Sequence, residues 1–301
     1  MTDGRVLAID FGGTKVAMAT ATATSLGRLG TVLRLQTQPS AGADQVVRRS
    51  LEAARTLIAA PASVGVSTFG VVRGGRVQLA PNVPGWDGME LPRLLREEFG
   101  TIPVAIDNDV KAAARAELRW GALRGVDVGV YLNLGTGLAT ALVVGGTVVR
   151  GAHGAAGEIA YLISSAGESG FADGRAPCEE LVSGAALAAR GSAALGRPVT
   201  AHDLFTMHDD PTVRPLLDDA TATLAMVVAN VCITLNPERV VVGGGMMRAA
   251  HHILPRIRAE VGRTVPFPPT ITTARFIDDA PLLGALALAL DSIDPSENPS
   301  C

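Results

Sequence analysis

Residues 5–20 read RVLAIDFGGTKVAMAT, and this stretch decides the fold. An apolar run at residues 6–9 ends in Asp10, and a glycine turn separates it from a second alternating run that begins at Val16. The pattern predicts a strand, a tight turn and a returning strand. Paired glycines let the backbone approach a ligand closely and direct N–H groups at an anion. The Asp10 carboxylate at the mouth of the turn suits a hydrated Mg²⁺ ion.

The same turn also carries Thr14 and Lys15, whose hydroxyl and ammonium groups suit a polyphosphate. By itself a Gly-Gly hairpin turn is more often only a turn, and the G-x-x-x-x-G-K-[ST] phosphate loop is absent. Residues 128–149, VGVYLNLGTGLATALVVGGTVV, repeat the order of strand, glycine turn and returning strand. The repeat predicts two similar halves, each with a phosphate-facing turn, that together hold the β- and γ-phosphates of a nucleotide.

Composition limits the class of protein. The chain has 301 residues, 48% of them hydrophobic, so two domains are expected. The net charge of −3 without a long basic run does not indicate a nucleic-acid partner. No secretory signal and no uninterrupted apolar run of about 18 residues is found, so no membrane span is expected. Cys178, Cys232 and Cys301 lie far apart, which fits a reducing cytoplasm.

Residues 104–117, VAIDNDVKAAARAE, predict an apolar strand that leads into an alanine-rich helix. One residue of Asp107-Asn108-Asp109 is explained as the helix N-cap, which is worth about 1 kcal/mol. Three successive polar residues exceed what one cap requires, and strand ends are where α/β sheets bind ligands. We therefore expect a functional site here. Lys111, in the same motif, is expected to be a solvated helix residue.

Two further segments allow either a functional or a structural interpretation. Residues 78–88, QLAPNVPGWDG, form a rigid loop that suits hydroxyl recognition, although Trp86 as a core residue is the simpler explanation. Residues 240–248, VVVGGGMMR, predict a strand, a glycine turn and a helix start. Such a turn lets an adenine or ribose lie against the backbone, or it is a plain strand-to-helix connection.

Taken together and in this order, six motifs across residues 5–291 resemble the ROK family of sugar kinases, the group that contains bacterial glucokinases. The motifs are DFGGTK (10–15), APNVPGW (80–86), DNDVKAAARAE (107–117), LGTGLATALV (134–143), RGAHGAAGE (150–158) and VVGGG (241–245). The resemblance implies an α/β, actin-like ATPase (ribonuclease H-like) fold with two lobes and a central cleft for sugar and ATP. Some members carry an N-terminal helix-turn-helix; here the first phosphate turn begins at residue 10, which disfavours the repressor branch.

The resemblance also implies residue roles. Asp109 falls on the position of the catalytic base. The positions that hold sugar hydroxyls are Asn82, Asn108, Asp109, Glu158, Tyr161 and Glu180. The positions that hold ATP are Asp10, Gly12, Gly13, Thr14, Lys15, Gly135, Thr136, Gly137, Gly243, Gly244 and Gly245, with Mg²⁺ held near Asp10 through water.

One departure from the family concerns zinc, which most members bind through a His in G-E-x-G-H and the cysteines of C-x-C-G-x-x-G-C-x-E. Here Tyr161 stands where the His is expected, and Phe171 and Asp173 replace two cysteines, so only Cys178 remains. One thiolate cannot complete a four-ligand site, so we predict no structural zinc. The loop is then expected to be looser or to be packed by Phe171. The lost His also leaves the acceptor undecided.

The expected organisation is a small lobe at residues 1–117, with a C-terminal helix at about 281–293 that packs back onto it, a large lobe at 118–280 and a frayed tail at 294–301. The leading hypothesis is an ATP-dependent, cytoplasmic kinase for a hexose or hexose-like polyol. The alternatives are a kinase for a C7-cyclitol or an amino sugar, or a non-catalytic sugar-binding sensor. The sequence does not decide between ATP and polyphosphate as donor. The resemblance suggests a homodimer.

Overall fold

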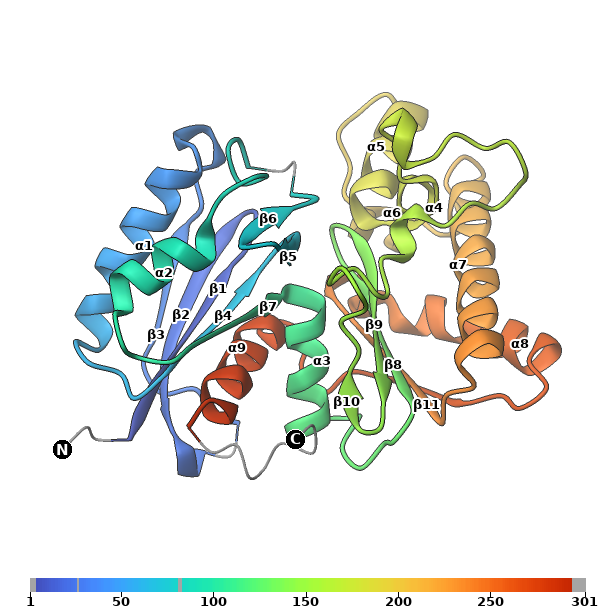
Figure 1. Cartoon of the computed structure of the whole chain (residues 1–301). Helices are drawn as coiled ribbons and strands as arrows, with labels where there is room; N and C mark the ends of the chain where they lie inside the picture. The colour runs from blue at the N-terminus through green and yellow to red at the C-terminus, as the bar shows by residue number, and fades with distance from the viewer. Residues whose placement is uncertain (1–3, 26, 81–82, 294–301) are drawn as a thin grey trace. The chain divides into compact units, whose positions relative to one another are not determined.

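The computed structural model describes residues 4–25, 27–80 and 83–293, and the chain forms two compact α/β units. Unit 1 comprises Met1–Arg124, Arg150–Ala155 and Asp279–Cys301, and unit 2 comprises Gly125–Val149 and Ala156–Asp278. The short segment at 150–155 thus belongs to unit 1, whereas the boundary expected from the sequence assigned it to the second lobe. Figure 1 shows both units in the colours of the chain.

Each unit contains a five-stranded sheet with the same order and the same strand directions. In unit 1 the order is β3 (Val32–Gln36), β2 (Lys15–Thr22), β1 (Arg5–Phe11), β4 (Val64–Thr68) and β7 (Val104–Asn108). In unit 2 it is β10 (Thr147–Val148), β9 (Leu138–Val144), β8 (Gly129–Leu134), β11 (Arg239–Gly243) and β12 (Thr270–Thr273). In each sheet the first strand pairs antiparallel with the second, and the second pairs antiparallel with the third. The third, fourth and fifth strands run parallel to one another. The two similar halves predicted from the repeated hairpin are confirmed.

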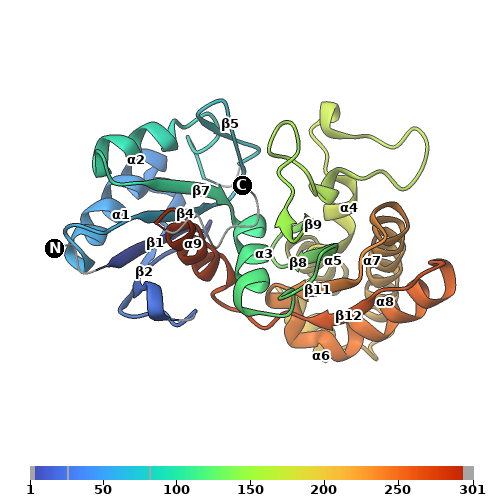
Figure 2. The same ribbon diagram turned by 60° about the horizontal axis from the view of Figure 1, so that its bottom comes forward.

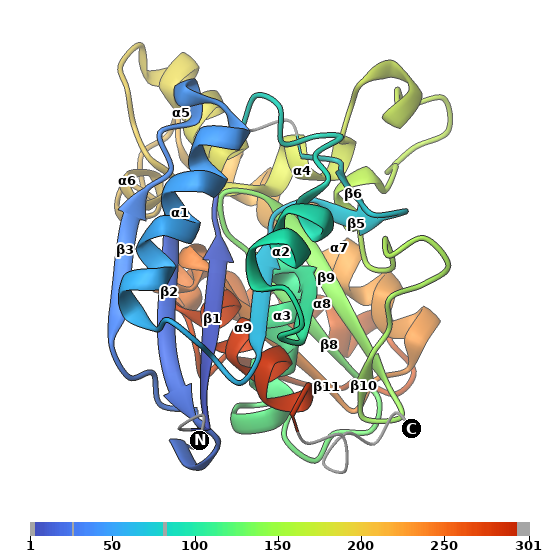
Figure 3. The ribbon, with the colours of Figure 1, turned by 60° about the vertical axis from the view of Figure 1, so that its left-hand side comes forward.

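Helices cover both faces of the sheet in unit 1 (Figure 3). The helices are α1 (Ala43–Leu57), α2 (Leu91–Phe99), α3 (Asp109–Trp120) and α9 (Ala280–Asp291), beside a small hairpin of β5 (Val71–Arg73) and β6 (Arg76–Gln78). α1 and α2 lie on one face, and α9 and α3 lie on the other. Nearly all of α9 is buried, which is why its sequence, APLLGALALALD, is apolar on every side.

Two glycines allow α9 to lie unusually close to its neighbours. A Cβ atom added at Gly65 of β4 would lie 1.8 Å from the carbonyl oxygen of Ala285 in α9. A Cβ atom added at Gly284 of α9 would lie 1.9 Å from the carbonyl oxygen of Ala112 in α3. Because backbone atoms occupy both positions, no side-chain rearrangement can make room. The C-terminal helix is therefore an integral layer of unit 1.

Trp86 lies in the core of unit 1, as the simpler sequence interpretation held. Its ring is fully buried, stacks on Phe69 at 4.8 Å between ring centroids and lies 5.4 Å from Phe11. The indole N–H donates to the Thr68 hydroxyl at 3.0 Å. Trp86 thus anchors residues 83–88, the described second part of the Pro- and Gly-rich loop, with its polar N–H edge satisfied.

We expect Trp86→Ala to lower the free energy of unfolding by about 3–5 kcal/mol, because it removes a large buried ring and leaves a cavity. Urea unfolding followed by circular dichroism measures the change. Trp86→Phe keeps an aromatic ring and loses the hydrogen bond to Thr68, so its loss should be clearly smaller. Equal stability of Trp86→Ala and the wild type would contradict this account of the core.

Five α-helices of the described chain belong to unit 2 (Figure 2), and the core residues of its sheet lie in β8, β9, β11 and β12. The helices are α4 (Pro177–Val182), α5 (Gly184–Leu195), α6 (Ala201–Thr206), α7 (Arg214–Leu235) and α8 (Ala250–Thr264). Within the described part of the chain, α7 alone is long and apolar enough to cross a membrane, whereas the sequence analysis expected no such segment. Half of its most apolar window is buried in the structure, and buried core helices pass the same test.

Candidate active site

The first glycine turn connects β1 to β2 and is rigidly held. The Gly12 N–H donates to the Lys15 carbonyl at 3.1 Å, and the Thr37 hydroxyl donates to the Gly12 carbonyl at 2.7 Å. A Cβ atom at Gly12 would lie 2.7 Å from the Lys15 carbonyl oxygen, so only glycine fits there. A Cβ atom at Gly13 would meet nothing within 4 Å, and Thr14 and Lys15 are exposed. The turn therefore offers an open backbone surface beside a hydroxyl and a cation.

Polar side chains collect where the parallel strands of unit 1 end. The register places Asp10 of β1 beside Ser67 of β4, and Ser67 beside Asp107 of β7. The Ser67 hydroxyl donates to the Asp10 carboxylate at 2.9 Å. Burial raises the pKa of Asp10 to about 7, although this hydrogen bond opposes the shift; the nearby Asp109 carboxylate adds to it. Asp10 and Asp109, which the sequence predicted as site residues, are thus brought together.

Ser67 was missed by the sequence analysis. It closes a short apolar strand, ASVGVS, and only its position in a parallel sheet places it next to Asp10. A polar residue at the carboxyl end of a predicted parallel strand is the signal that would have identified it.

The three polar residues after β7 have separate roles. Asp107 is buried and pairs with Arg150 at 3.0 Å and with Arg115 at 3.5 Å. Asn108 is the N-cap of α3, since its side-chain oxygen accepts from the Lys111 N–H at 2.8 Å. Asp109 is the first residue of α3 and serves neither purpose. The residue that neither an ion pair nor a cap explains is therefore the predicted base.

Burial raises the pKa of the Asp109 carboxyl to about 6, while hydrogen bonds from backbone N–H groups and the Lys111 charge oppose the shift. One of those bonds is donated by the Val110 N–H at 2.9 Å. A carboxylate that titrates near 6 is a stronger base than an ordinary aspartate and is still largely ionised at neutral pH. Lys111 itself is fully buried, so the expectation that it is a solvated helix residue is wrong.

Unit 2 brings the two remaining glycine turns together. The turn between β8 and β9 is closed by a hydrogen bond from the Gly135 N–H to the Gly137 carbonyl at 3.1 Å. Gly244 follows β11 with φ of 88°, and a Cβ atom there would lie 2.3 Å from the Leu134 carbonyl oxygen. Gly245 has open space on its Cβ side. The chain leads from Gly245 into a 3₁₀ helix, Gly245–Ala249, rather than directly into the α-helix expected there.

The predicted acceptor-side residues Glu158, Tyr161 and Glu180 also lie in unit 2. Glu158 precedes a 3₁₀ helix, Ile159–Tyr161, and together with burial its charge raises the pKa of the Tyr161 hydroxyl. Glu180 in α4 is paired with Arg175, and hydrogen bonds from Arg175 and from the Ala176 N–H lower the pKa of its carboxyl to about 2. The pairing with Arg175 was not foreseen. Asn82 lies outside the described residues.

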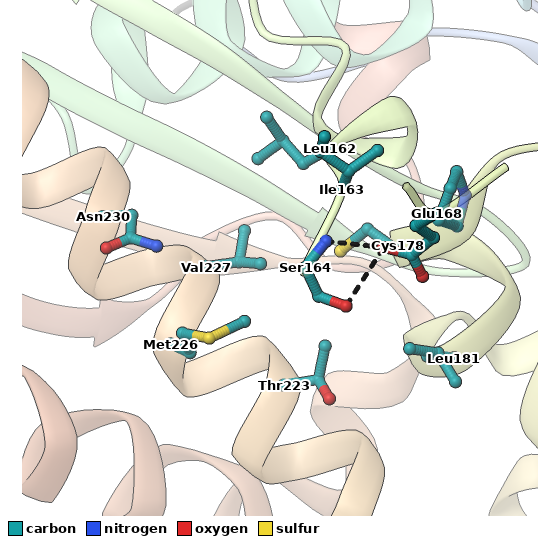
Figure 4. Close-up of a pocket in the computed structure, with 11 residues that line it drawn as sticks. Leu162, Ile163, Ser164, Glu168, Cys178, Leu181, Thr223, Met226, Val227 and Asn230 are labelled. Carbon is teal, nitrogen blue, oxygen red and sulfur yellow. Dashed lines mark hydrogen bonds between the residues drawn. The ribbon is translucent and has the colours of Figure 1, made fainter. Parts of the chain in front are cut away.

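The loop that follows Tyr161 is held by side chains. The Phe171 ring meets the Tyr161 ring edge-on at 5.4 Å, as one of the two sequence alternatives proposed, although 62% of Phe171 is exposed. Glu168 accepts from the Ser164 N–H at 2.7 Å (Figure 4). Behind this loop a cavity of about 110 Å³ separates residues 162–164 from α7, with buried Cys178 in its wall. Among the described residues no group of three or more His, Cys, Asp or Glu side chains has the arrangement of a metal site.

The residues present fit a nucleotide and a hydrated Mg²⁺ ion. The backbone is open at Gly13 and at Gly245, so phosphate or ribose can approach it without meeting a side chain. Mg²⁺ keeps most of its water ligands and needs only one or two carboxylates, and Asp10 places one carboxylate near the end of β1. The predicted residues thus form two groups: the first turn with Asn108 and Asp109 in unit 1, and the other turns with Glu158, Tyr161 and Glu180 in unit 2.

Several known kinases are similar to this chain in sequence or in structure. The kanosamine kinase of Amycolatopsis mediterranei is 31% identical over 298 residues, which cover 94% of this chain and 95% of that protein. The structure of a ROK hexokinase from Thermus thermophilus is 28% identical with a TM-score of 0.81, and the match covers 97% of this chain and 99% of that one. The structure of a ROK glucokinase from Streptomyces griseus, in complex with glucose and AMPPNP, is 25% identical with a TM-score of 0.78, over 95% and 99% of the two chains.

Two other matches cover less than two thirds of the related protein. The match with an uncharacterised protein, CPE0188, of Clostridium perfringens covers 60% of this chain and 61% of that protein. The match with the bifunctional enzyme NanE/NanK of Brucella melitensis covers 94% of this chain and 54% of that protein. The fold of two similar α/β units, each with a glycine turn after its first strand, is the actin-like ATPase fold of the matched kinase structures. The ROK family model matches residues 6–292, nearly the whole chain. The chain therefore belongs to the ROK family.

Proposed function

We propose that this chain is an ATP-dependent kinase that phosphorylates a hydroxyl group of a hexose or hexose-like polyol. The observation that carries the proposal is Asp109, which opens α3 beside Asp10 and has a pKa raised by burial to about 6. A buried carboxylate of this kind suits the removal of a proton from an attacking hydroxyl. Family membership and relatives with kinase names support the same assignment.

In this proposal Asp109 accepts the proton of the acceptor hydroxyl, and Asp10 holds Mg²⁺ through water. The N–H groups of the glycine turns bind the phosphates, and Mg²⁺ held near Asp10 would supply positive charge to the transferring group. The acceptor is oriented by Asn82, Asn108, Glu158, Tyr161 and Glu180. Phosphoryl transfer depends on positioning more than on covalent chemistry, so fixed turns and a fixed base suffice.

An amino sugar is a second candidate acceptor. Relatives about 30% identical to this chain are a kanosamine kinase and an N-acetylmannosamine kinase of Shigella flexneri. Tyr161, packed against Phe171, presents a phenol where the family pattern has His, and Arg175 stands beside Glu180. These differences change the hydrogen-bonding groups that an acceptor meets. A C7-cyclitol remains a third candidate on the same ground.

A coupled assay of ADP release tests the function with glucose, mannose, N-acetylmannosamine, kanosamine and a C7-cyclitol as acceptors, and with ATP or polyphosphate as donor. We expect turnover with at least one hexose or amino sugar that exceeds hydrolysis without acceptor. Binding of a sugar without turnover from either donor would contradict the kinase and favour a sugar-binding sensor.

We further propose that the protein works in the cytoplasm as a homodimer without structural zinc. Buried Cys178 and Cys232, whose thiol pKa values burial raises to about 11, suit a reducing compartment. Size-exclusion chromatography with light scattering tests the dimer. About one zinc per purified chain by elemental analysis would contradict the prediction for zinc.

A further inference from the structure

Glu179, a carboxylate that the sequence analysis did not single out, contacts the second glycine turn. The Leu138 N–H donates to the Glu179 carboxylate at 2.8 Å. A Cβ atom at Gly137 would lie 2.7 Å from the same carboxylate oxygen, so glycine at this position leaves room for Glu179. A hydrogen bond from an N–H to an ionised carboxylate is short and about twice as strong as one between neutral groups.

The chain that follows Glu179 holds the other side of the same turn. The Gly184 N–H donates to the Gly135 carbonyl at 2.9 Å, and the Ala185 N–H donates to the Thr136 carbonyl at 3.2 Å. The turn is therefore bonded to α4 through the Glu179 side chain and to α5 through backbone atoms. Its geometry depends on where these two short helices lie.

Glu179 also lies beside the acceptor-side residues. Its sequence neighbour is Glu180, and its charge reaches the hydroxyl of Tyr161, where it contributes after burial and Glu158 to the raised pKa. The helix that carries Glu179 packs against the 3₁₀ helix that carries Tyr161. One carboxylate thus joins the segment proposed for the acceptor to the turn proposed for the nucleotide.

We infer that Glu179 is a positioning residue: its carboxylate fixes the Gly135–Gly137 turn against α4 and thereby sets the affinity for the nucleotide. The inference rests on the proposed kinase function. A negative charge near a phosphate site repels phosphate, so the carboxylate helps binding only by ordering the turn before the nucleotide arrives. Glutamine at this position keeps an oxygen acceptor for the Leu138 N–H and removes the charge, which separates the two effects.

The test compares Glu179→Ala with Glu179→Gln by two measurements on the full chain. Amide hydrogen exchange reports on the Leu138 N–H, and calorimetry measures the Kd of AMPPNP with Mg²⁺. We expect Glu179→Ala to speed exchange at Leu138 and weaken AMPPNP binding by about 10-fold or more, as loss of a charge-assisted hydrogen bond implies. Glu179→Gln should change both values less than Glu179→Ala does, because a neutral, weaker acceptor oxygen remains for the Leu138 N–H and the repulsion of phosphate is removed.

Glu168→Ala is the matched control. It removes a carboxylate of the same unit that also accepts a backbone N–H, that of Ser164, and it has no contact with the turn. This variant should change neither Leu138 exchange nor AMPPNP affinity. Unchanged exchange in Glu179→Ala, or equal losses in Glu179→Ala and Glu179→Gln, would overturn the positioning role. A wild type that binds no nucleotide would instead contradict the proposed function, while the exchange measurement still decides whether Glu179 orders the turn.

Discussion

Asp109→Asn should lower kcat by about 10²- to 10⁴-fold, the usual effect of removing a general base. Asparagine keeps the size of the side chain and its place at the first position of α3, and it cannot accept the proton of the acceptor hydroxyl. The ADP-release assay with the preferred acceptor measures the loss. Asp44→Asn, which changes an exposed aspartate in the first turn of α1, is the matched control and should retain full activity.

The pH dependence of the same reaction tests whether the pKa of Asp109 is raised in the folded protein. The base must be ionised, so kcat/KM should fall as pH drops through about 6, where burial places the pKa of Asp109. An aspartate with an ordinary pKa of about 3.9 would keep the enzyme active two units lower. A flat profile from pH 7 to pH 5, or more than about a tenth of wild-type kcat in Asp109→Asn, would remove Asp109 from this role.

The thermal stability of Asp109→Asn shows whether the variant loses activity because the base is missing or because the protein is misfolded. The folded-state pKa of Asp109 lies above its unfolded value of 3.8, so the unfolded chain loses this proton first as pH rises. The free energy of unfolding therefore decreases as the pH rises from 3.8 to about 6. At pH 7 it is lower than it would be without the carboxylate. Asp109→Asn should unfold at a temperature equal to or above that of the wild type at pH 7. A lower value would attribute its inactivity to misfolding.

Gly65→Ala should cost at least about 3 kcal/mol of the free energy of unfolding, a large part of the total of a typical domain. The added Cβ atom meets the Ala285 carbonyl oxygen at 1.8 Å, so the α9 backbone has to move away from β4. Gly284→Ala produces the same conflict with Ala112 of α3. Urea unfolding gives the energy, and hydrogen exchange shows whether protection is lost in α9.

Gly262→Ala is the matched control for these two changes. Gly262 lies inside α8 with nothing within 4 Å of an added Cβ atom, so alanine should stabilise that helix by about 0.5–1 kcal/mol. If alanine destabilises the protein at positions 65 and 284 and stabilises it at position 262, the difference is explained by the backbone atoms that the added Cβ meets. If Gly65→Ala were as stable as the wild type, α9 would not be packed on β4 as described.

Much of the candidate site could be predicted from local sequence. The Asp10 turn, the Asp-Asn-Asp run before α3 and the two later glycine turns each combine a strand end with residues that only a turn or a ligand explains. Trp86 was correctly expected in the core. The burial of Lys111 was not expected. A single charged residue in an alanine-rich helix indicates a solvated face unless another part of the protein covers it.

The sequence by itself determined the repeated strand–turn–strand pattern, hence two α/β units of equal topology, and the carboxylates and glycines at their strand ends. Only the tertiary structure decided that Ser67 bonds Asp10, that Glu179 holds Leu138, and that Arg175 pairs with Glu180. Strand and turn propensities act over a few neighbouring residues, so they can be read locally. Hydrogen bonds between residues as distant as 10 and 67, or 138 and 179, exist only after parallel strands and helices have packed, and that packing sets the pKa and the position of each acidic group.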